Sequence, residues 1–176
     1  DGGTGSDNMT GGNGVDTFVI RSGDGNADLA NADIITDFQD GTDVIGLDGL
    51  TFENLTITQG TGSNSSHTII RITSSGEYLA ILQNLSTSNI SILDFSSTAT
   101  TAQTLNGTSG NDSNVGGAGI DTFNGEAGND TFLGHGGDDI FNITTKSGTF
   151  NDIIDGGATD TLSISYTGVS SLGDFV

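Results

Sequence analysis

The sequence of 176 residues contains no cysteine, no proline and no tryptophan. Without cysteine, disulfide bonds cannot hold the fold together, and a zinc or redox site built from thiolates is excluded. Without proline, a polyproline spacer between domains is excluded as well. No apolar run reaches the length of a membrane span, so we expect no transmembrane segment.

Positive charge is also scarce: three lysine and arginine residues stand against 23 aspartate and glutamate residues, for a formal net charge of −20. A field of this sign excludes nucleic acid as a partner. Three of the acids are glutamates (Glu53, Glu77 and Glu126), which leaves 20 aspartates. The short aspartate side chain suits turns and compact sites with oxygen ligands, whereas helices favour glutamate. The acids therefore indicate turns that can bind a cation.

Glycine, by contrast, is abundant, with 29 residues, and it recurs with a fixed period. Residues 107–142 read as four consecutive nonapeptides, GTSGNDSNV, GGAGIDTFN, GEAGNDTFL and GHGGDDIFN. Each has glycine at positions one and four and aspartate at position six, and three of the four have phenylalanine at position eight. Two further copies, GGTGSDNMT and GGNGVDTFV, fill residues 2–19. A fixed nine-residue period predicts a repeat architecture.

Charge divides the chain into three predicted segments. Residues 1–48 carry a net charge of −9, residues 49–105 of −2, and residues 106–176 of −9. In both acidic segments the nonapeptides are followed by acidic turns and apolar pairs with looser spacing. The middle segment has apolar and threonine-rich runs of strand length. It predicts an antiparallel sheet or small sandwich that caps the first array, because a stack of repeats leaves its end face unpaired.

The nonapeptide pattern implies a specific chemistry. Glycines free the backbone to turn with positive φ and to point carbonyl oxygens inward, and the aspartate adds a carboxylate to the same turn. Such an all-oxygen site suits calcium better than magnesium, which requires strict octahedral geometry. One inward phenylalanine contributes only about 2–3 kcal/mol, so the position-eight residues Phe123, Phe132 and Phe141 form a thin core. Repulsion between neighbouring carboxylates then couples folding to cation binding.

The nonapeptides resemble the hemolysin-type (RTX) calcium-binding repeat, G-G-x-G-x-D-x-U-x. The resemblance implies an all-β fold with right-handed parallel β-rolls, in which two nonapeptides make one turn and several calcium ions (Ca2+) line both edges. With the middle segment included, the expected architecture is two parallel RTX-type β-rolls with an intervening antiparallel β sheet or sandwich cap. The copy at residues 107–115 departs from the pattern with Asn114 at position eight, so we expect it to be a half-built first rung.

Carried over residue by residue, the resemblance implies metal ligands from the carboxylates at position six and from backbone carbonyls of the glycine turns. The position-six carboxylates belong to Asp7, Asp16, Asp112, Asp121, Asp130 and Asp139. The glycines of these turns are Gly2, Gly5, Gly11, Gly14, Gly107, Gly116, Gly119, Gly125, Gly128 and Gly134. Aspartates of the looser stretches are further candidates, namely Asp24, Asp33, Asp37, Asp43, Asp152 and Asp160. The alternative is a set of solvated acidic turns, against which six copies in register argue.

No nucleophile signature lies near either histidine, His67 or His135, so we expect no enzyme activity from this chain. The leading hypothesis is a calcium-binding structural module of a secreted or cell-surface bacterial RTX protein, of adhesin, surface-layer or filament type. By the resemblance, such a module leaves the cell unfolded through type I secretion and folds on calcium outside. The alternative is the non-catalytic C-terminal module of an RTX enzyme, such as a protease, lipase or epimerase. Besides calcium, the candidate partners are a second copy of the chain, by self-association, and a surface polysaccharide.

Overall fold

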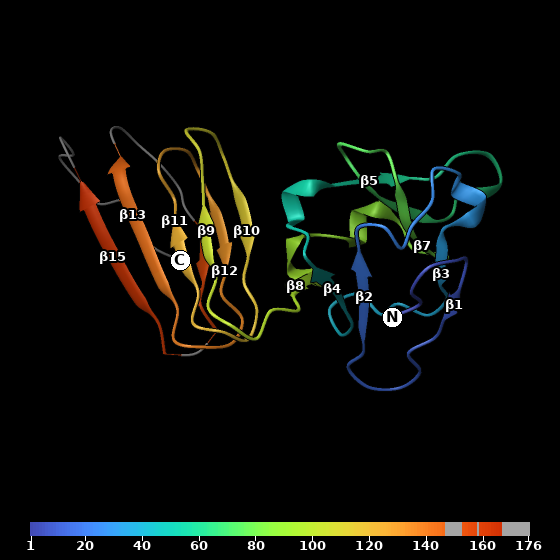
Figure 1. The fold of residues 1–176 in the computed structure, drawn as a ribbon, viewed down its shortest axis with the longest axis horizontal. Coiled ribbons are helices and arrows are strands. Elements are labelled where there is room, and N and C mark those ends of the chain that lie inside the picture. Colours follow the sequence, from blue (N-terminus) through green and yellow to red (C-terminus); the bar gives the residue numbers. More distant parts are fainter. Residues whose placement is uncertain (147–152, 158, 167–176) are drawn as a thin grey trace. The chain divides into compact units, whose positions relative to one another are not determined.

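The computed structural model describes residues 1–146, 153–157 and 159–166, which Figure 1 draws as ribbon. Regular structure in these ranges consists of β-strands and short 3-10 turns, without any α-helix. The chain divides into two compact units, Asp1–Ser97 and Thr98–Val176. The prediction of an all-β fold built on parallel strands is confirmed. The boundary after Ser97 places residues 98–105, which composition assigns to the middle segment, in the second unit.

The first unit is a roll whose chain alternates between two β-sheets, within which the strands of successive turns pair in parallel (Figure 1). The strands of one sheet that pair in parallel are β1 (Asn8–Met9), β3 (Asp33–Ile35) and β7 (Tyr78–Leu82). Those of the other sheet are β2 (Thr17–Arg21), β4 (Val44–Asp48) and β8 (Phe95–Ser97). Each successive pair of strands, one from each sheet, makes one turn of the roll. The loosely spaced acidic stretch after Arg21 is therefore a second turn of the roll.

The antiparallel strands predicted for the middle segment are present, and they extend one of the roll's own sheets. Strand β5 (Leu55–Gln59) pairs antiparallel with β6 (Thr68–Ile72), and β6 pairs antiparallel with β7. The resulting order is β1-β3-β7-β6-β5. Strand β7 is buried along most of its length, as a strand flanked on both sides and covered on both faces requires. Through β7, the hairpin and the roll share one hydrogen-bonded sheet.

Short 3-10 turns connect these strands. They are η1 (Leu29–Asn31), η2 (Phe52–Asn54), η3 (Gly62–Asn64), η4 (Thr87–Asn89) and η5 (Ile92–Asp94). Asp28, Ser86 and Ser91 precede η1, η4 and η5, and their side-chain oxygens each accept a backbone N–H of the turn that follows. These residue types are the usual helix caps, because they satisfy N–H groups that have no partner within the turn.

The second unit follows the nonapeptide rhythm, with sheets of order β15-β13-β11-β9 and β10-β12-β14. All of its strand pairs are parallel. The strands are β9 (Thr104–Asn106), β10 (Ser113–Val115), β11 (Thr122–Asn124), β12 (Thr131–Leu133), β13 (Ile140–Lys146), β14 (Ile153–Asp155) and β15 (Thr161–Tyr166). The side chain of Asn142 donates to that of Asn124 at 2.9 Å, across 18 residues. Two nonapeptides thus make one turn, as the RTX resemblance implies.

Residues 98–106, TATTAQTLN, form a rung that sequence analysis does not recognise. Strand β9 pairs with β11, with Leu105 opposite Phe123. In the turn before it, Ala118 donates its N–H to the carbonyl of Ala99 at 3.0 Å, as one turn of a roll does to the next. This rung lacks both the glycines and the aspartate of the repeat. Leu105 packs against the phenylalanine cluster, and the side chain of Asn124 donates to that of Asn106 at 2.7 Å. Residues 98–106 are therefore the first rung of the second unit, and the copy at residues 107–115, predicted as the first, is the second.

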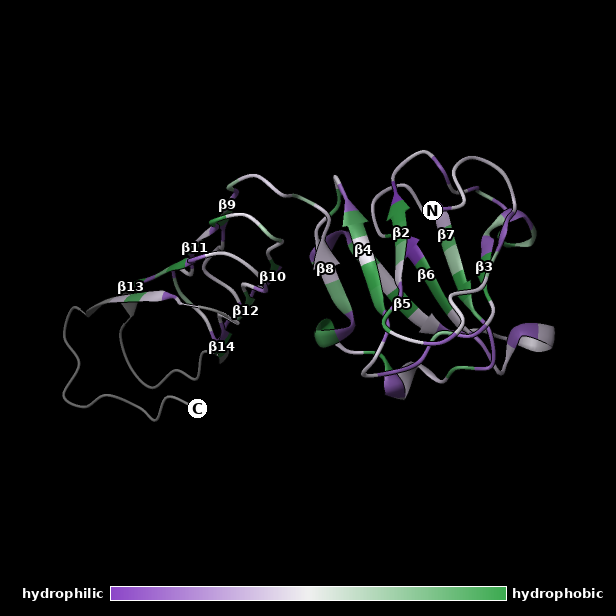
Figure 2. Cartoon of the chain, turned by 90° about the horizontal axis from the view of Figure 1, so that it is seen from below, coloured by the Kyte–Doolittle hydropathy of each residue, from purple (hydrophilic) through white to green (hydrophobic). Residues whose placement is uncertain are grey.

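The two units have cores of different composition. In the first, twelve buried residues drawn from both sheets and their connections pack together, and apolar residues run along β2, β4 and β7 in Figure 2. In the described part of the second unit, the cluster consists of Phe123, Phe132, Phe141 and Ile143. The rings of Phe123 and Phe141 stack with their centroids 4.8 Å apart. The prediction that position eight points inward is confirmed for all three phenylalanines.

Replacement of Phe132 by alanine tests the thin core. Phe132 is fully buried against both Phe123 and Phe141, so Phe132→Ala should lower the free energy of unfolding by about 3–5 kcal/mol. Urea unfolding in saturating calcium, followed by circular dichroism, measures the change. Ile120→Ala is the control, because Ile120 is 54% exposed, and it should change stability by no more than about 0.5 kcal/mol. Equal losses in the two variants would contradict the position of the core.

Candidate calcium site at the edges of the rolls

Aspartates stand at the points where glycine turns enter strands. In the second unit, Asp112, Asp121, Asp130 and Asp139 directly precede β10, β11, β12 and β13, and all four are buried. Strands β10 and β12 belong to one sheet and β11 and β13 to the other. The two pairs of aspartates therefore lie on opposite edges of the roll. Each edge carries a column of buried carboxylates, one for each turn.

Carboxylates along these columns accept a backbone N–H from the preceding turn. The N–H of Asp112 donates to Oδ1 of Asp130 at 3.1 Å, and the N–H of Asp121 donates to Oδ1 of Asp139 at 2.8 Å. The N–H of Asp139 donates in the same way to Oδ1 of Asp160 at 2.9 Å. The structure thus brings together Asp112 and Asp130 on one edge, and Asp121, Asp139 and Asp160 on the other. Buried carboxylates need such donors, because burial without a partner is strongly unfavourable.

The second carboxylate oxygen faces its own turn. Oδ2 of Asp112 accepts the N–H of Thr108 at 2.7 Å, and Oδ2 of Asp121 accepts the N–H of Gly117 at 2.9 Å. Oδ2 of Asp139 is buried and has no hydrogen-bond partner in the described part of the chain. A buried acceptor without a partner requires an explanation, and a bound cation would satisfy it.

The electrostatics at Asp139 also indicate a need for a cation. Burial raises the pKa of the Asp139 carboxyl above its ordinary value, and the hydrogen bond from the Asp121 N–H opposes that effect. The charges of Asp121, Asp160 and Asp138 raise this pKa further. In the absence of a cation, the fold therefore disfavours the ionised form of Asp139. A cation beside this carboxylate would reverse the preference.

Glycine at position one lies against these carboxylates. A Cβ added to Gly116 would meet Oδ2 of Asp121 at 2.5 Å and the carbonyl oxygen of Gly134 at 2.9 Å. Carboxylate and carbonyl oxygens from successive turns thus converge on one glycine. A Cβ on any of the predicted position-one glycines would meet an aspartate side chain, which holds for Gly2, Gly11, Gly107, Gly116, Gly125 and Gly134.

Glycine at position four allows the turns to stack. Gly128 has a φ of 134°, and a Cβ there would clash with the carbonyl oxygen of Gly110, one turn earlier. Gly5 and Gly14 have φ values of 131° and 119°, which side chains rarely tolerate. A Cβ on Gly119 would meet the backbone of Thr101. The predicted glycines are thus required by the turns, whether or not their carbonyls bind an ion.

The looser stretch of the first unit repeats the same arrangement. The N–H of Asp7 donates to Oδ1 of Asp33 at 2.9 Å, and the N–H of Asp16 donates to Oδ1 of Asp43 at 3.1 Å. Asp33 and Asp43 are buried, and burial raises the pKa of the Asp33 carboxyl, against the effect of the Asp7 N–H. Among the described residues, Oδ2 of Asp16 is buried without a hydrogen-bond partner, and Asp16 lines a pocket of about 290 Å³ with Phe18. Asp33 and Asp43 hold the positions in the second turn that Asp7 and Asp16 hold in the first.

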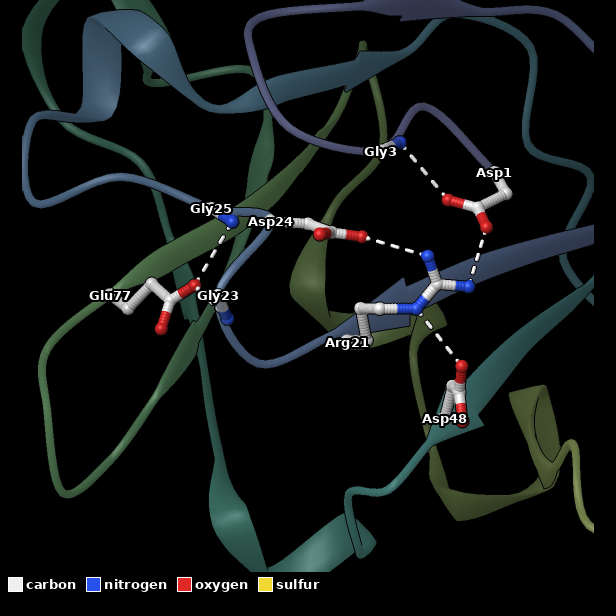
Figure 3. Close-up of polar contacts among 8 residues, drawn as sticks. All are labelled: Asp1, Gly3, Arg21, Gly23, Asp24, Gly25, Asp48 and Glu77. Carbon is white, nitrogen blue, oxygen red and sulfur yellow. Dashed lines mark hydrogen bonds and ion pairs between the residues drawn. The ribbon is translucent and has the colours of Figure 1, made fainter.

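Two other predicted ligands have other partners. The two carboxylate oxygens of Asp37 accept the N–H groups of Gly11 and Gly12, each at 2.9 Å. Asp24 forms an ion pair with Arg21 at 3.1 Å (Figure 3). The structure does not place either carboxylate in the columns of stacked aspartates, and their role as ligands stays a prediction.

Sequence analysis misses one aspartate of the series. Asp94 directly precedes β8, as Asp16 and Asp43 precede β2 and β4, and it is buried. Its Oδ2 accepts the N–H of Ser91 at 2.8 Å. No glycine pattern precedes Asp94, so the nine-residue spacing that reveals the other aspartates is missing here. Asp152, a further predicted ligand, lies outside the described residues.

Two family models match the chain. The RTX calcium-binding nonapeptide repeat, in four copies, matches residues 106–141. The C-terminal domain of serralysin, of peptidase family M10, matches residues 1–105, which is more than half of the 176 residues. The chain belongs to the serralysin C-terminal domain family. No curated protein matches it.

The two matches confirm the RTX resemblance and define the type of module. The serralysin C-terminal domain is the non-catalytic part of serralysin-like proteins, and RTX nonapeptides bind calcium. Both are typical of extracellular proteins that leave the cell by type I secretion. In the described ranges of this serralysin-type chain, no helix has the length and apolar character needed to cross a membrane.

The residues of this serralysin-type module fit calcium. Among the described residues, no three histidine or acidic side chains converge on a point, so an ion at an edge would take most of its ligands from backbone carbonyls. Calcium accepts roughly six to eight oxygen ligands in flexible geometry, whereas magnesium requires an octahedron. Asp16 and Asp139 each offer one buried carboxylate oxygen that has no hydrogen-bond partner in the described ranges. When bound, calcium would supply the positive charge that these columns lack.

Replacement of Gly128 by alanine tests the stacking of the turns. The positive φ of Gly128 and the carbonyl oxygen of Gly110 both oppose a Cβ, so Gly128→Ala should lower the free energy of unfolding by more than about 1 kcal/mol. Gly110→Ala is the control, since the nearest atom to its added Cβ is Thr108 Oγ1 at 3.6 Å. Thermal unfolding in saturating calcium compares the two variants. Equal effects would contradict the stacking.

A double substitution in one aspartate column tests the ligand assignment. Asp121→Asn with Asp139→Asn removes two buried carboxylates from one edge of the second unit. We expect fewer calcium ions to bind. Any site that remains on this edge should bind calcium at least about tenfold more weakly, as isothermal titration calorimetry would measure.

The control for this double variant is Asp138→Asn with Asp155→Asn, which removes the same charge from exposed positions. It should leave the stoichiometry unchanged. If both double variants weakened binding equally, the net charge rather than the columns would control the affinity.

Proposed function

We propose that the chain is a calcium-dependent folding module of a secreted bacterial RTX protein, which completes its folding on binding calcium outside the cell. The supporting observation is the column Asp121–Asp139–Asp160, in which one buried oxygen of Asp139 has no hydrogen-bond partner among the residues that the structure describes. Ionised groups in such a column repel one another and have lost their contact with water. Binding of a cation would offset both effects, so that folding and binding would become one event.

Stacked pairs of aspartates set the number of ions that we expect. Hydrogen bonds join the pairs Asp7–Asp33, Asp16–Asp43, Asp112–Asp130, Asp121–Asp139 and Asp139–Asp160. One ion between the two turns of each pair gives about five ions for the described part of the chain, since each calcium needs roughly six to eight oxygens and two turns can supply them.

The serralysin match supports an RTX enzyme as the parent, such as a protease, lipase or epimerase, with this chain as its non-catalytic secretion and folding module. The second candidate is a structural module of an adhesin, surface-layer or filament protein, with self-association or binding of a surface polysaccharide. It is supported by the second unit, whose RTX repeats extend beyond the span of the serralysin match. A catalytic motif in the same gene would favour the first parent, and further tandem rolls would favour the second.

Calcium titration of the full chain after treatment with EDTA tests the proposed function. Far-UV circular dichroism should show a gain of β-structure with a midpoint at roughly 10⁻⁴–10⁻³ M calcium. Magnesium at the same concentrations should produce a much smaller gain, because the turns do not form a rigid octahedron. A spectrum that stays the same from EDTA to millimolar calcium would contradict coupled folding and binding.

A further inference from the structure

The two units carry similar charge but differ in what holds them together. Residues 1–97 contain 13 acidic residues and two arginines, a net charge of −11, and residues 98–176 contain 10 acidic residues and Lys146, a net charge of −9. We propose that the first unit keeps its fold without calcium, and that the second unit is the part whose folding calcium controls. This proposal rests on the proposed function, because it takes calcium as the bound cation. It adds which half of the chain needs that cation to fold.

The first reason is the size of the core. The first unit buries twelve residues in its main cluster, and a second cluster of Ala32, Ile69 and Ile81 covers another face. The cluster in the described part of the second unit has four buried members. Burial of apolar area is the main stabilising contribution in folding, and it does not depend on any ion. The first unit therefore has an ion-independent source of stability that the described second unit largely lacks.

The second reason is the hairpin of β5 and β6. Its strands pair with each other and with β7 through backbone hydrogen bonds over five and four register positions. None of the predicted calcium ligands lies in β5, β6 or β7. Since β7 also pairs with β3, the hairpin stabilises the roll through a strand that belongs to both. The described strands of the second unit pair only within the roll.

The third reason is an arginine that takes the place of an ion at one edge of the first unit. The guanidinium of Arg21 contacts the carboxylates of Asp1, Asp24 and Asp48, with distances of 3.1 Å to Asp24 and 2.9 Å to Asp48 (Figure 3). Arg21 lies opposite Asp48 in the register of β2 and β4, so the cluster joins two successive turns. A single exposed ion pair contributes little, but here one cation separates three carboxylates that would otherwise repel one another.

A glutamate fixes the loop that brings Asp24 to this cluster. Oε1 of Glu77 accepts the N–H of Gly23 at 2.8 Å and of Gly25 at 2.9 Å (Figure 3). The two amides flank Asp24, so the loop is tied to the turn before β7. The anion-to-amide bonds hold this edge in place through groups of the chain itself.

The second unit has no arginine that could act in the same way. Its sequence holds a single basic residue of the lysine and arginine type, Lys146. In the described ranges it buries four aspartates, while its apolar cluster has four buried members. Charges buried beside so little apolar area leave the second unit dependent on an added cation.

Hydrogen–deuterium exchange of the full chain, resolved by mass spectrometry of its peptides, tests the proposal. In EDTA, amides of β4 and β7 should exchange at least about 100-fold more slowly than in an unfolded chain, while amides of β11 and β12 should exchange within about threefold of the unfolded rate. In millimolar calcium, both sets should be protected.

Replacement of Arg21 by glutamine tests the internal cation. In EDTA, Arg21→Gln should accelerate exchange in β2 and β4 on the order of tenfold, because three carboxylates lose their shared partner. Arg71→Gln is the control, since it removes the same charge from the chain's other arginine, on β6. It should leave exchange in β2 and β4 within about twofold of the unsubstituted chain.

The outcomes separate this proposal from the proposed function. Loss of protection in both units in EDTA, with recovery in calcium, would overturn the present proposal and leave calcium-driven folding intact. Full protection of both units in EDTA would overturn both. If Arg21→Gln behaved like Arg71→Gln, Arg21 would not act as an internal cation, and this part of the proposal would be wrong.

Discussion

The interaction on which both rolls depend is the contact between an aspartate carboxylate and the backbone of the neighbouring turn. The amide of Asp121 bonds to the carboxylate of Asp139, and the amide of Asp7 bonds to that of Asp33 in the same way. These bonds place a row of charges in the interior of the protein, where water cannot solvate them. The same geometry that connects the turns therefore creates a need for positive charge beside the carboxylates, and the two units differ in how far other interactions offset that need.

The two units differ in how much of their stability comes from interactions other than this carboxylate contact. Around the carboxylates of the first unit, the chain builds a large apolar cluster and a hairpin with its own hydrogen bonds. In the second unit, stacked rings such as Phe123 and Phe141 fill the described interior. A roll of strict nonapeptides has closely spaced sites but a small core, because each rung buries only one or two apolar side chains. In the first unit, whose turns are irregular, the core is larger and the sites are less regularly spaced.

The strict repeats could be predicted from the sequence because each position has one physical task. Glycine at position one makes room for a carboxylate, aspartate at position six bonds to the next turn, and phenylalanine at position eight fills the core, as Gly116, Asp121 and Phe123 illustrate. Once the period is seen, the register of β11, β12 and β13 follows. The ligand roles of these residues stay predictions.

The features outside the strict repeats could not be predicted, because pairing between backbone strands defines them. The rung at residues 98–106 has no glycine and no aspartate, yet β9 pairs with β11 in full register. Asp94 reaches the start of β8 through an insertion of two antiparallel strands, which hides its relation to Asp16 and Asp43. The addition of the hairpin to the roll's sheet depends on β7, whose apolar residues allow either a parallel or an antiparallel neighbour. Side-chain patterns do not determine such choices.

The most direct test of this account is a crystal structure of the chain grown in calcium, with anomalous scattering recorded at long wavelength to locate the ions. The account predicts anomalous peaks along the two edges of the second unit, between Asp112 and Asp130 and between Asp121 and Asp139. Each peak should lie within about 2.3–2.6 Å of carboxylate and carbonyl oxygens. The same fold with no peaks at these edges, or with peaks only at exposed acids such as Asp138, would contradict it.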